Sequence, residues 1–447
     1  MHLICLLPFG NPTLIRHKLT TANGNIIGLE VKISKKIYYE SVKIKRKEYK
    51  FGFVGVNMKL KEICEINPKT QGIDDSTEVS FVPMSSVTED GKIDSYDIRN
   101  YLDVKKGYTV FQEGDVLFAK ITPCMENGKG AIAYGLMNGK GCGSSEFYVL
   151  RPNKAVVTDE WIYYLTAWGG FRKEAEKHMT GSAGQKRVPK AYLENYVVNV
   201  PSIEEQKQQI TVLVQLQQII DNRKKELDCL DELIRARFVE LFGDPIQNPK
   251  GWDTSLIENL VANEKNALKA GPFGSALKKE YYVESGYKIY GQEQVISGDH
   301  TIGNYYIDKE RYKILENCAV QAGDVLISLV GTYGKLLIIP DEFEPGIINP
   351  RLMKITFDKN KVNPLYFKFF FQSESLKRVL SENTHGGTMD ILNLGIVRKI
   401  SMPLPPLKLQ NKFFSFVEQV DKSKVAIQKS LDEVRVLLDS MNQKYFG

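Results

Sequence analysis

The feature that most constrains this chain is that its sequence repeats itself once along its length. FQEGDVLFAK at residues 111–120 returns as VQAGDVLISL at residues 320–329, and in both a Gly-Asp turn leads into an apolar run typical of a strand. VNVPSIEEQ, which ends at Gln206, returns as MPLPPLKLQ, which ends at Gln410, 204 residues later. Both copies then run 36 residues further to a Phe-Gly pair.

Each half therefore contains a β-rich mixed region, a proline-containing stretch and one long helical pattern. A solenoid is excluded, because such arrays use short periods and at least three units. Two large copies instead predict a pseudo-twofold repeat within one chain. The segment from Asp244-Pro245 to Pro249-Lys250-Gly251-Trp252 cannot continue a helix, so we expect a domain boundary there.

Both long segments carry apolar residues at steps of seven, the spacing of a coiled-coil seam. The seam of the first consists of Leu213, Leu216, Ile220, Leu227, Leu230, Ile234 and Leu241, interrupted by Arg223 and Arg237. That of the second consists of Val417, Val420, Ile427, Leu431, Val434, Leu438, Met441 and Tyr445, interrupted by Lys424. Since both segments share the seam and the length, we expect them to pair as spacers of roughly 50 Å. The alternative is that each lies on its own domain as an amphipathic helix.

Composition narrows the class of protein. The net charge of +6 is a weak indication of a nucleic-acid partner, and a solvated surface explains it equally well. The six cysteines are scattered, which argues against disulfides and a cysteine-rich zinc site and suits a reducing cytoplasm. No run approaches the roughly 18 apolar residues that a membrane span needs. Met1–Gly10 lacks a basic leader and a cleavage site, so we expect no secretion signal.

Motifs of catalysis are missing from the sequence. There is no GxxxxGK[ST] phosphate loop, no GxSxG elbow, and no histidine pair with metal-ligand spacing. Asn363-Pro364-Leu365-Tyr366 approaches the Asn/Asp-Pro-Pro-aromatic motif of amino-methyltransferases but lacks the second proline. We interpret it as a helix cap followed by a first-turn proline. The chain is predicted to be non-catalytic and to hold no metal.

Several loops combine glycine, cations and hydrogen-bonding side chains, a mixture that lets a backbone approach phosphates and lets side chains read base edges. Singly such loops usually just turn the chain, but they recur after equivalent strands in both halves. The candidate DNA-binding residues are Lys120, Thr122, Asn127, Lys129, Ser182, Gln185, Lys186 and Arg187 in the first half, and Phe273, Ser275, Lys278, Thr332, Tyr333, Lys335, Arg351 and Thr388 in the second.

Taken together, these residues resemble the specificity subunits of type I restriction–modification systems. The matching features are the repeat itself, EGDVLFAKITPCMENGKGAIA, SSEFYVLRP, TGSAGQ, VPSIEEQ, GDPIQNPKGW and GPFGSALKK, in that order from about Met58 to Gly447. The resemblance implies an α+β fold with two mixed α/β target recognition domains separated by two long antiparallel coiled-coil helices. It divides the chain into recognition domains at 58–200 and 244–404 and spacer helices at 201–243 and 405–447.

The resemblance also implies the function. Each recognition domain would read one part of a bipartite site in double-stranded DNA, and two modification subunits would dock on the helices. Those subunits would carry S-adenosylmethionine and the adenine-N6 methyltransferase chemistry, and restriction subunits would add ATP- and Mg-dependent translocation and cleavage. This chain would itself need no cofactor.

Residues 1–57 lie outside the resemblance and include a basic stretch from Lys32 to Lys50. They are either an additional DNA-contacting arm or an upstream extension. Two other functions stay open at this point. One is a fused or stand-alone DNA modification enzyme, which S-adenosylmethionine binding by the chain alone would support. The other is a structural coiled-coil protein, which salt-resistant binding to a single DNA sequence would exclude.

Overall fold

The computed structural model describes the strands Lys18–Ala22 and Asn25–Glu30 and residues 55–447, apart from 70–71, 183, 330–334 and 383–391. The first two strands, β1 and β2, pair antiparallel. The chain divides into two compact units. The first comprises residues 1–210 with Phe446, and the second comprises residues 211–445 with Gly447.

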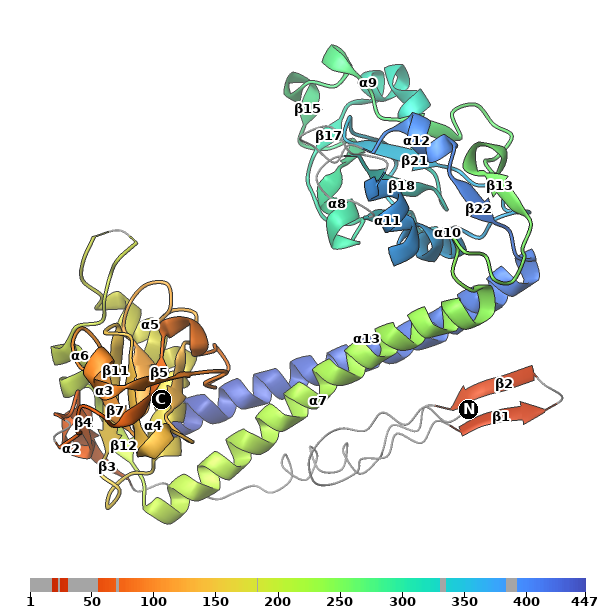
Figure 1. Cartoon of the computed structure of the whole chain (residues 1–447). Coiled ribbons are helices and arrows are strands. Elements are labelled where there is room, and N and C mark those ends of the chain that lie inside the picture. Colours follow the sequence, from red (N-terminus) through yellow and green to blue (C-terminus); the bar gives the residue numbers. More distant parts are fainter. Residues whose placement is uncertain are drawn as a thin grey trace. The chain divides into compact units, whose positions relative to one another are not determined.

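The first unit is built on two four-stranded sheets and a two-stranded ribbon (Figure 1). The sheet orders are β6-β5-β10-β7 and β4-β11-β8-β9, and the ribbon is β12-β3. The strands are β3 Val56–Lys59, β4 Cys64–Ile66, β5 Glu78–Val82, β6 Asp97–Asn100, β7 Thr109–Gln112, β8 Val116–Ala119, β9 Gly130–Ile132, β10 Lys140–Gly143, β11 Phe147–Pro152 and β12 Val197–Val200. The helices are α2 Leu60–Ile63, α3 Tyr101–Val104, α4 Asp159–Ala167, α5 Gly169–Lys177 and α6 Lys190–Asn195.

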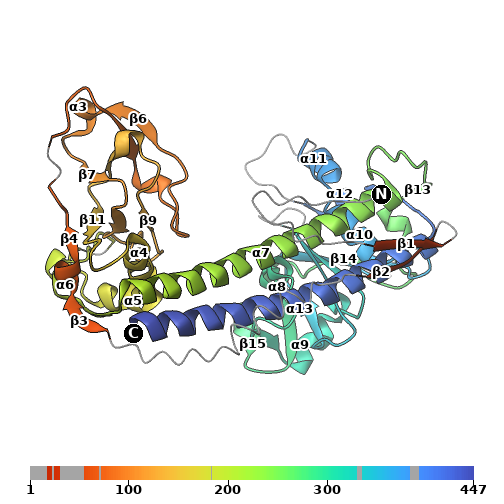
Figure 2. The same cartoon turned by 90° about the horizontal axis from the view of Figure 1, so that it is seen from below.

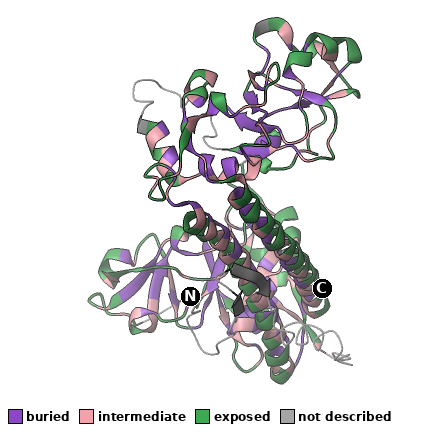
Figure 3. Ribbon diagram, turned by 90° about the vertical axis from the view of Figure 1, so that its right-hand side faces the viewer, coloured by how far each residue is buried: buried purple, intermediate pink, exposed green. Residues whose placement is uncertain are grey.

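The apolar run of β8 is continuous because the strand is covered on both faces, as strands in the middle of a layered domain are. Leu117 and Ala119 join a core that includes Phe111 of β7. On the other face, the ring of Phe118 meets that of Phe171 in α5, with centroids 5.8 Å apart. Figure 3 shows this concentration of buried residues within each mixed domain.

The second unit repeats this plan. Its sheets are β14-β21-β18-β19 and β15-β17-β16-β20, with the ribbon β13-β22. The strands are β13 Thr254–Leu256, β14 Leu268–Ala270, β15 Tyr282–Val283, β16 Tyr287–Tyr290, β17 Tyr306–Ile307, β18 Val325–Ser328, β19 Leu336–Ile338, β20 Gly346–Ile348, β21 Leu352–Ile355 and β22 Ser401–Pro403. The shorter helices are α8 Gln292–Ser297, α9 Lys309–Ile314, α10 Pro364–Phe371, α11 Glu374–Glu382 and α12 Leu394–Arg398.

The repeated Gly-Asp turns lead into β8 and β18, the two equivalent central strands. Asp115 is buried, accepts the backbone N–H of Gln112 at 2.8 Å and pairs with Arg151 at 2.7 Å. Asp324 is buried in the same way and accepts the N–H of Gln321 at 3.0 Å. Its cationic partner is Lys354, at 3.3 Å. Each aspartate thus closes its turn and pairs with a cation on the neighbouring strand.

Two helices of 40 residues each, α7 Ile203–Phe242 and α13 Leu407–Phe446, lie side by side in both views (Figure 1, Figure 2). Leu216 and Ile220 pack with Leu431 and Val434, whereas residues later in α7 pack with residues earlier in α13. The pairing is therefore antiparallel. This arrangement, with its two repeated mixed domains, confirms the predicted fold class.

The seam residues lie where the helices meet. Leu213, Ile220, Ile234, Val420, Ile427, Leu431 and Val434 are buried, and Leu227, Leu241 and Leu438 are partly buried against the same clusters. The interruptions are accommodated by charge pairing. Arg223 is buried and pairs with Glu226 at 2.6 Å, and Lys424 reaches Asp231 of the other helix at 2.7 Å.

The repeat extends to individual hydrogen bonds at the start of each long helix. The amide nitrogen of Gln206 donates to the carbonyls of Val156 and Pro201, and its oxygen accepts the N–H of Thr158 at 3.0 Å. The side chain of Gln410 makes the equivalent three bonds, to the carbonyls of Lys361 and Pro405 and from the N–H of Asn363 at 2.9 Å. Each glutamine thus fixes the first turn of its helix to the segment that follows the central sheet.

The helix ends also correspond. Within the first unit the ring of Phe446 packs on Trp161, with centroids 5.4 Å apart. Within the second unit the ring of Phe242 packs on Tyr366, with centroids 4.8 Å apart. The Phe-Gly pairs that mark the end of each copy therefore supply an aromatic anchor, one in each unit.

We expect Gln206→Leu and Gln410→Leu to destabilise the protein by similar amounts. Each substitution leaves one buried and two partly buried backbone groups without their partner, and an unpaired buried group costs about 1–3 kcal/mol. The free energy of unfolding from urea titration measures the effect. Gln208→Leu and Gln419→Leu are matched controls, because both side chains are exposed on the same helices. Equal stability of test and control variants would contradict the assigned role.

Candidate nucleic-acid interface

The candidate loops gather at the end of the central strand of each mixed domain. In the first domain, three backbone hydrogen bonds join them where β8 ends. Ala119 donates to the carbonyl of Lys129 at 3.3 Å, Lys120 donates to that of Glu146 at 2.9 Å, and Val188 donates to that of Lys120 at 2.9 Å.

The second domain has the same three bonds where β18 ends. Ser328 donates to the carbonyl of Lys335 at 3.3 Å, Leu329 donates to that of Arg351 at 2.9 Å, and Leu392 donates to that of Leu329 at 3.1 Å. The two domains thus share one backbone framework. Its side chains differ, since Lys120 corresponds to Leu329 and Glu146 to Arg351.

An ion pair organises the framework in the first domain. Arg187 donates to both carboxylate oxygens of Glu146, from Nε at 2.9 Å and from Nη2 at 2.8 Å, and donates from Nη1 to the carbonyl of Gln185 at 3.0 Å. The hydrogen bonds from Arg187 hold the pKa of Glu146 below its usual range. Lys120 donates to the carbonyl of Ser145 at 2.7 Å, and partial burial lowers the pKa of its ammonium.

Arg187 also closes the loop that begins at Thr180. The two residues exchange backbone hydrogen bonds of 3.0 and 2.8 Å. Gly181 has a φ of 125°, and a Cβ there would lie 2.9 Å from the carbonyl oxygen of Gln185, so the turn requires glycine. The result is a short hairpin whose Ser182, Gln185 and Lys186 are exposed.

The remaining first-domain candidates lie in the loop after β8. Thr122 donates its hydroxyl to Glu126 at 2.7 Å, and its N–H to the carbonyl of Lys186 at 3.0 Å. Lys129 donates to the carbonyl of Met84 at 3.1 Å, whereas Asn127 is exposed. Lys120, Lys129 and Arg187 therefore all have partners within the protein. DNA contact by these residues stays a prediction, and the exposed set is Asn127, Ser182, Gln185 and Lys186.

In the second domain, the candidates after β14 are displayed openly. The side chain of Phe273 is 78% exposed, and Ser275 and Lys278 are exposed as well. Gly271 sets the position of this loop, because its N–H donates to the carbonyl of Leu352 at 2.9 Å and a Cβ would lie 1.9 Å from the carbonyl oxygen of Asn349. Phe273 is thereby held near the start of β21.

Arg351 and Lys335 are exposed at the same strand ends. Arg351 donates from Nη1 to Oε1 of Gln292 at 3.3 Å, and Gln292 donates from Nε2 to Oγ of Ser328 at 2.8 Å. The sequence analysis missed Gln292 and Ser328. The available signal was the polar residue at the last position of the repeated strand, where the first copy has Ala119. Thr332, Tyr333, Thr388 and the basic stretch Lys32 to Lys50 lie outside the described residues.

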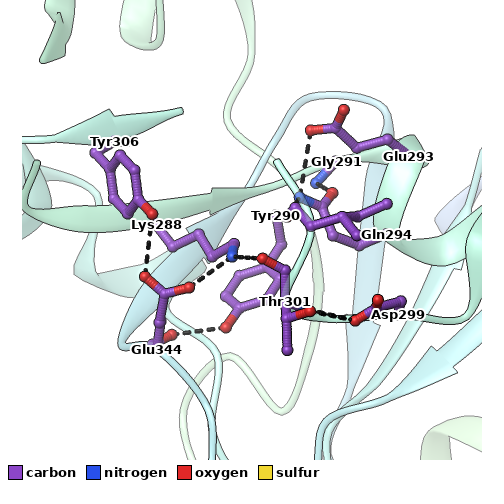
Figure 4. A network of polar contacts seen from close by, with 10 residues as sticks. Lys288, Tyr290, Gly291, Glu293, Gln294, Asp299, Thr301, Tyr306 and Glu344 are labelled. Carbon is purple, nitrogen blue, oxygen red and sulfur yellow. Dashed lines mark hydrogen bonds and ion pairs between the residues drawn. The ribbon is translucent and has the colours of Figure 1, made fainter. Parts of the chain in front are cut away.

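A buried lysine supports the segment that carries Gln292 (Figure 4). Lys288 is fully buried in β16, and its ammonium donates to Glu344 at 2.6 Å and to the carbonyl of Thr301 at 2.8 Å. The hydroxyl of Tyr290 donates to the carbonyl of Glu344 at 2.7 Å. A buried charge persists only with such compensation, so the end of β16 is firmly held. The hydrogen bond from Lys288 lowers the pKa of Glu344.

The near match to the amino-methyltransferase motif lies at the start of a helix. The interpretation of Asn363-Pro364 as a cap is confirmed, since Asn363 accepts the N–H of Leu365 at 2.9 Å and Pro364 begins α10.

Among the described residues, no group of three or more His, Cys, Asp or Glu side chains is placed to hold a metal ion. No helix in the described ranges has the length and apolar character for crossing a bilayer.

Known proteins share this doubled architecture. A family model described as "Type I restriction modification DNA specificity domain" matches residues 55–231 and again residues 251–434. The chain belongs to this family. The two matches correspond to the two copies of the internal repeat, so the predicted resemblance is confirmed.

Individual relatives agree. The chain is 41% identical over 183 residues to the type I restriction enzyme EcoAI specificity subunit of Escherichia coli, a match that covers 40% of this chain and 31% of that protein. It is 22% identical over 320 residues to the MjaVIII specificity subunit of Methanocaldococcus jannaschii, covering 67% and 73%. The chain thus spans about a third of the length of the EcoAI specificity subunit and of the EcoEI specificity subunit, also of E. coli.

A solved chain from work on complex assembly and conformational transition of the type I R-M system has the same fold. The superposition gives a TM-score of 0.64 at 17% identity, over 88% of this chain and 98% of that one.

We expect the hairpin from Thr180 to Arg187 to loosen in acid. A carboxyl whose folded pKa is lowered, as that of Glu146 is, stabilises the fold above its unfolded pKa of about 4.3. That contribution is lost as the pH falls through the lower folded value. Hydrogen exchange of Thr180 and Arg187, corrected for intrinsic rates, should therefore accelerate below about pH 4. Glu146→Gln should produce the faster exchange already at neutral pH, whereas exposed Glu89→Gln should not. Unchanged protection in Glu146→Gln would refute the anchor.

Proposed function

We propose that this chain is the DNA specificity subunit of a type I restriction–modification complex. Its two mixed domains read the two parts of a bipartite site in double-stranded DNA. The observation that supports this most directly is the shared backbone framework with different side chains at its edge. One scaffold presents Glu146 and Lys120 in the first domain, but Arg351 and Leu329 in the second. An asymmetric bipartite target requires two domains that share a backbone framework but present different side chains to the DNA.

The paired helices α7 and α13 act in this proposal as the spacer that fixes the gap between the two half-sites. They are also the docking surface for two modification subunits. The chain performs no chemistry itself. The modification subunits bring S-adenosylmethionine and methylate adenine at N6, and restriction subunits bring ATP- and Mg-dependent translocation and cleavage. The complex works in the cytoplasm, where the scattered cysteines stay reduced.

Methylation mapping tests the function. The chain is co-expressed with the methyltransferase subunit of the same system, in a host with no adenine-N6 methylation of its own. We expect the two proteins to co-purify and one bipartite adenine motif to become methylated. The control is the methyltransferase subunit expressed alone, which should leave no motif. A co-purified complex that methylates without sequence preference would contradict the proposal.

The spacer role makes a geometric prediction. Inserting one heptad after Leu227 and another after Ile427 preserves the seam and lengthens the helix pair by roughly 10 Å. At about 3.4 Å per base step, the unspecified gap should grow by about three base pairs. The bases read in each half-site should stay the same, because neither mixed domain is altered. Methylation mapping of the variant checks both, and an unchanged gap would refute the spacer.

A further inference from the structure

The two mixed domains carry opposite charges at one equivalent position of the shared framework. Glu146 and Arg351 both give their carbonyl to the residue that follows the central strand. The carboxylate of Glu146 is bound on both oxygens by Arg187. The guanidinium of Arg351 is exposed and donates a hydrogen bond to the neutral side-chain amide of Gln292. The second domain therefore presents a cationic donor where the first has an internal ion pair.

Arg351 is held from two sides. Its backbone N–H donates to Oδ1 of Asn349 at 2.9 Å, and its carbonyl accepts from Leu329 at 2.9 Å. Its side chain donates a hydrogen bond to Gln292. The side-chain amide of Gln292 donates in turn to the hydroxyl of Ser328, which orients it. Since Ser328 is only 2% exposed and lies in β18, this support rests on the core of the sheet.

The support for Gln292 continues into the buried network (Figure 4). Gln292 is the first residue of α8 and follows Gly291, whose N–H donates to Oε1 of Gln294 at 2.7 Å. Gly291 follows Tyr290, which the Lys288–Glu344 pair fixes through Glu344. An exposed arginine normally samples many rotamers, so a braced one reaches a fixed point at lower entropic cost.

Within the described part of the chain, one of the five N–H donors of the guanidinium is used, on Gln292, which leaves four for a ligand. Two parallel donors match O6 and N7 of guanine in the major groove, which is the commonest specific contact of arginine with a base. Adenine presents a donor where guanine presents O6, so the same fork rejects it. A phosphate would also accept these donors, but contact with it carries no sequence information.

We propose that Arg351 reads a guanine in the half-site bound by the second domain, with Gln292 and Ser328 as positioning residues that aim its guanidinium. The inference rests on the proposed function. It adds the base that is read, the residue that reads it and the two residues that position its side chain. It applies to the second domain alone, because Glu146 and Arg187 satisfy each other in the first.

The test uses the full chain in complex with its methyltransferase subunit, after mapping has given the target. DNA duplexes carry 7-deazaguanine in place of each guanine of the second half-site in turn, which removes N7 and keeps base pairing. We expect one position to weaken binding of the wild-type complex by roughly 2- to 12-fold, because the loss of N7 removes one of the two hydrogen bonds of a bidentate base contact. Substitutions in the first half-site serve as the comparison.

Variants assign that position to a residue. Arg351→Met removes the charge and every N–H donor of the side chain, so it should bind the natural site less tightly and become insensitive to 7-deazaguanine there. Gln292→Leu and Ser328→Ala should reduce the same sensitivity in part. Arg398→Met is the matched control, because Arg398 is exposed in α12 of the same domain. Thermal unfolding of each variant establishes that it is folded.

The outcomes separate the two proposals. Absence of any sequence-specific binding or methylation by the wild-type complex would overturn the function itself. Specific binding in which Arg351→Met retains the wild-type sensitivity to 7-deazaguanine would overturn only the role of Arg351. Equal weakening by Arg351→Met on all sequences, with a shallower salt dependence, would identify a phosphate contact and also overturn it.

Discussion

The structure depends on two buried strands, β8 and β18, each covered on both faces. Burial of their apolar side chains fixes the strands within the layers, and a buried aspartate paired with a cation closes the turn before each strand. The opposite ends of the strands are thereby fixed as well. Three backbone hydrogen bonds there gather loops from distant parts of each half. A surface built on such a core can change its side chains without moving its backbone.

In the function that we propose, this separation of scaffold and surface lets one repeated fold read two different half-sites. In the first domain the charges at the framework are mostly neutralised internally, and the exposed polar groups lie on the hairpin with Ser182, Gln185 and Lys186. In the second domain Arg351 is exposed and its side chain is hydrogen-bonded to Gln292. The side chain of Phe273 is exposed as well. Glycine at 181 and 271 lets each loop approach the neighbouring backbone closely, so the position of each loop depends on the absence of a side chain there.

The helix pair follows a different principle. Its stability comes from the apolar seam, which tolerates Arg223 and Lys424 because each finds a carboxylate partner. Gln206 and Gln410 tie the first turns of α7 and α13 to the domains that precede them, through matching sets of three bonds. Polar clamps at one end and an aromatic anchor, Phe242 or Phe446, at the other give each helix defined limits. The proposed spacer role needs such limits, because the gap between half-sites would otherwise vary.

The sequence by itself determined the doubled architecture, the two long helices and their seam, because repeat spacing and heptad periodicity are local patterns that burial imposes on the chain. It also located the loops at the strand ends. Only the tertiary structure decided that Lys120, Lys129 and Arg187 have hydrogen-bond partners within the protein. It also decided that Arg351 is hydrogen-bonded to Gln292, and Gln292 to Ser328. A sequence does not show which residue a cationic side chain pairs with. Glu146 lies 41 residues from Arg187, and Gln292 lies 59 residues from Arg351, so only folding brings them within hydrogen-bonding distance.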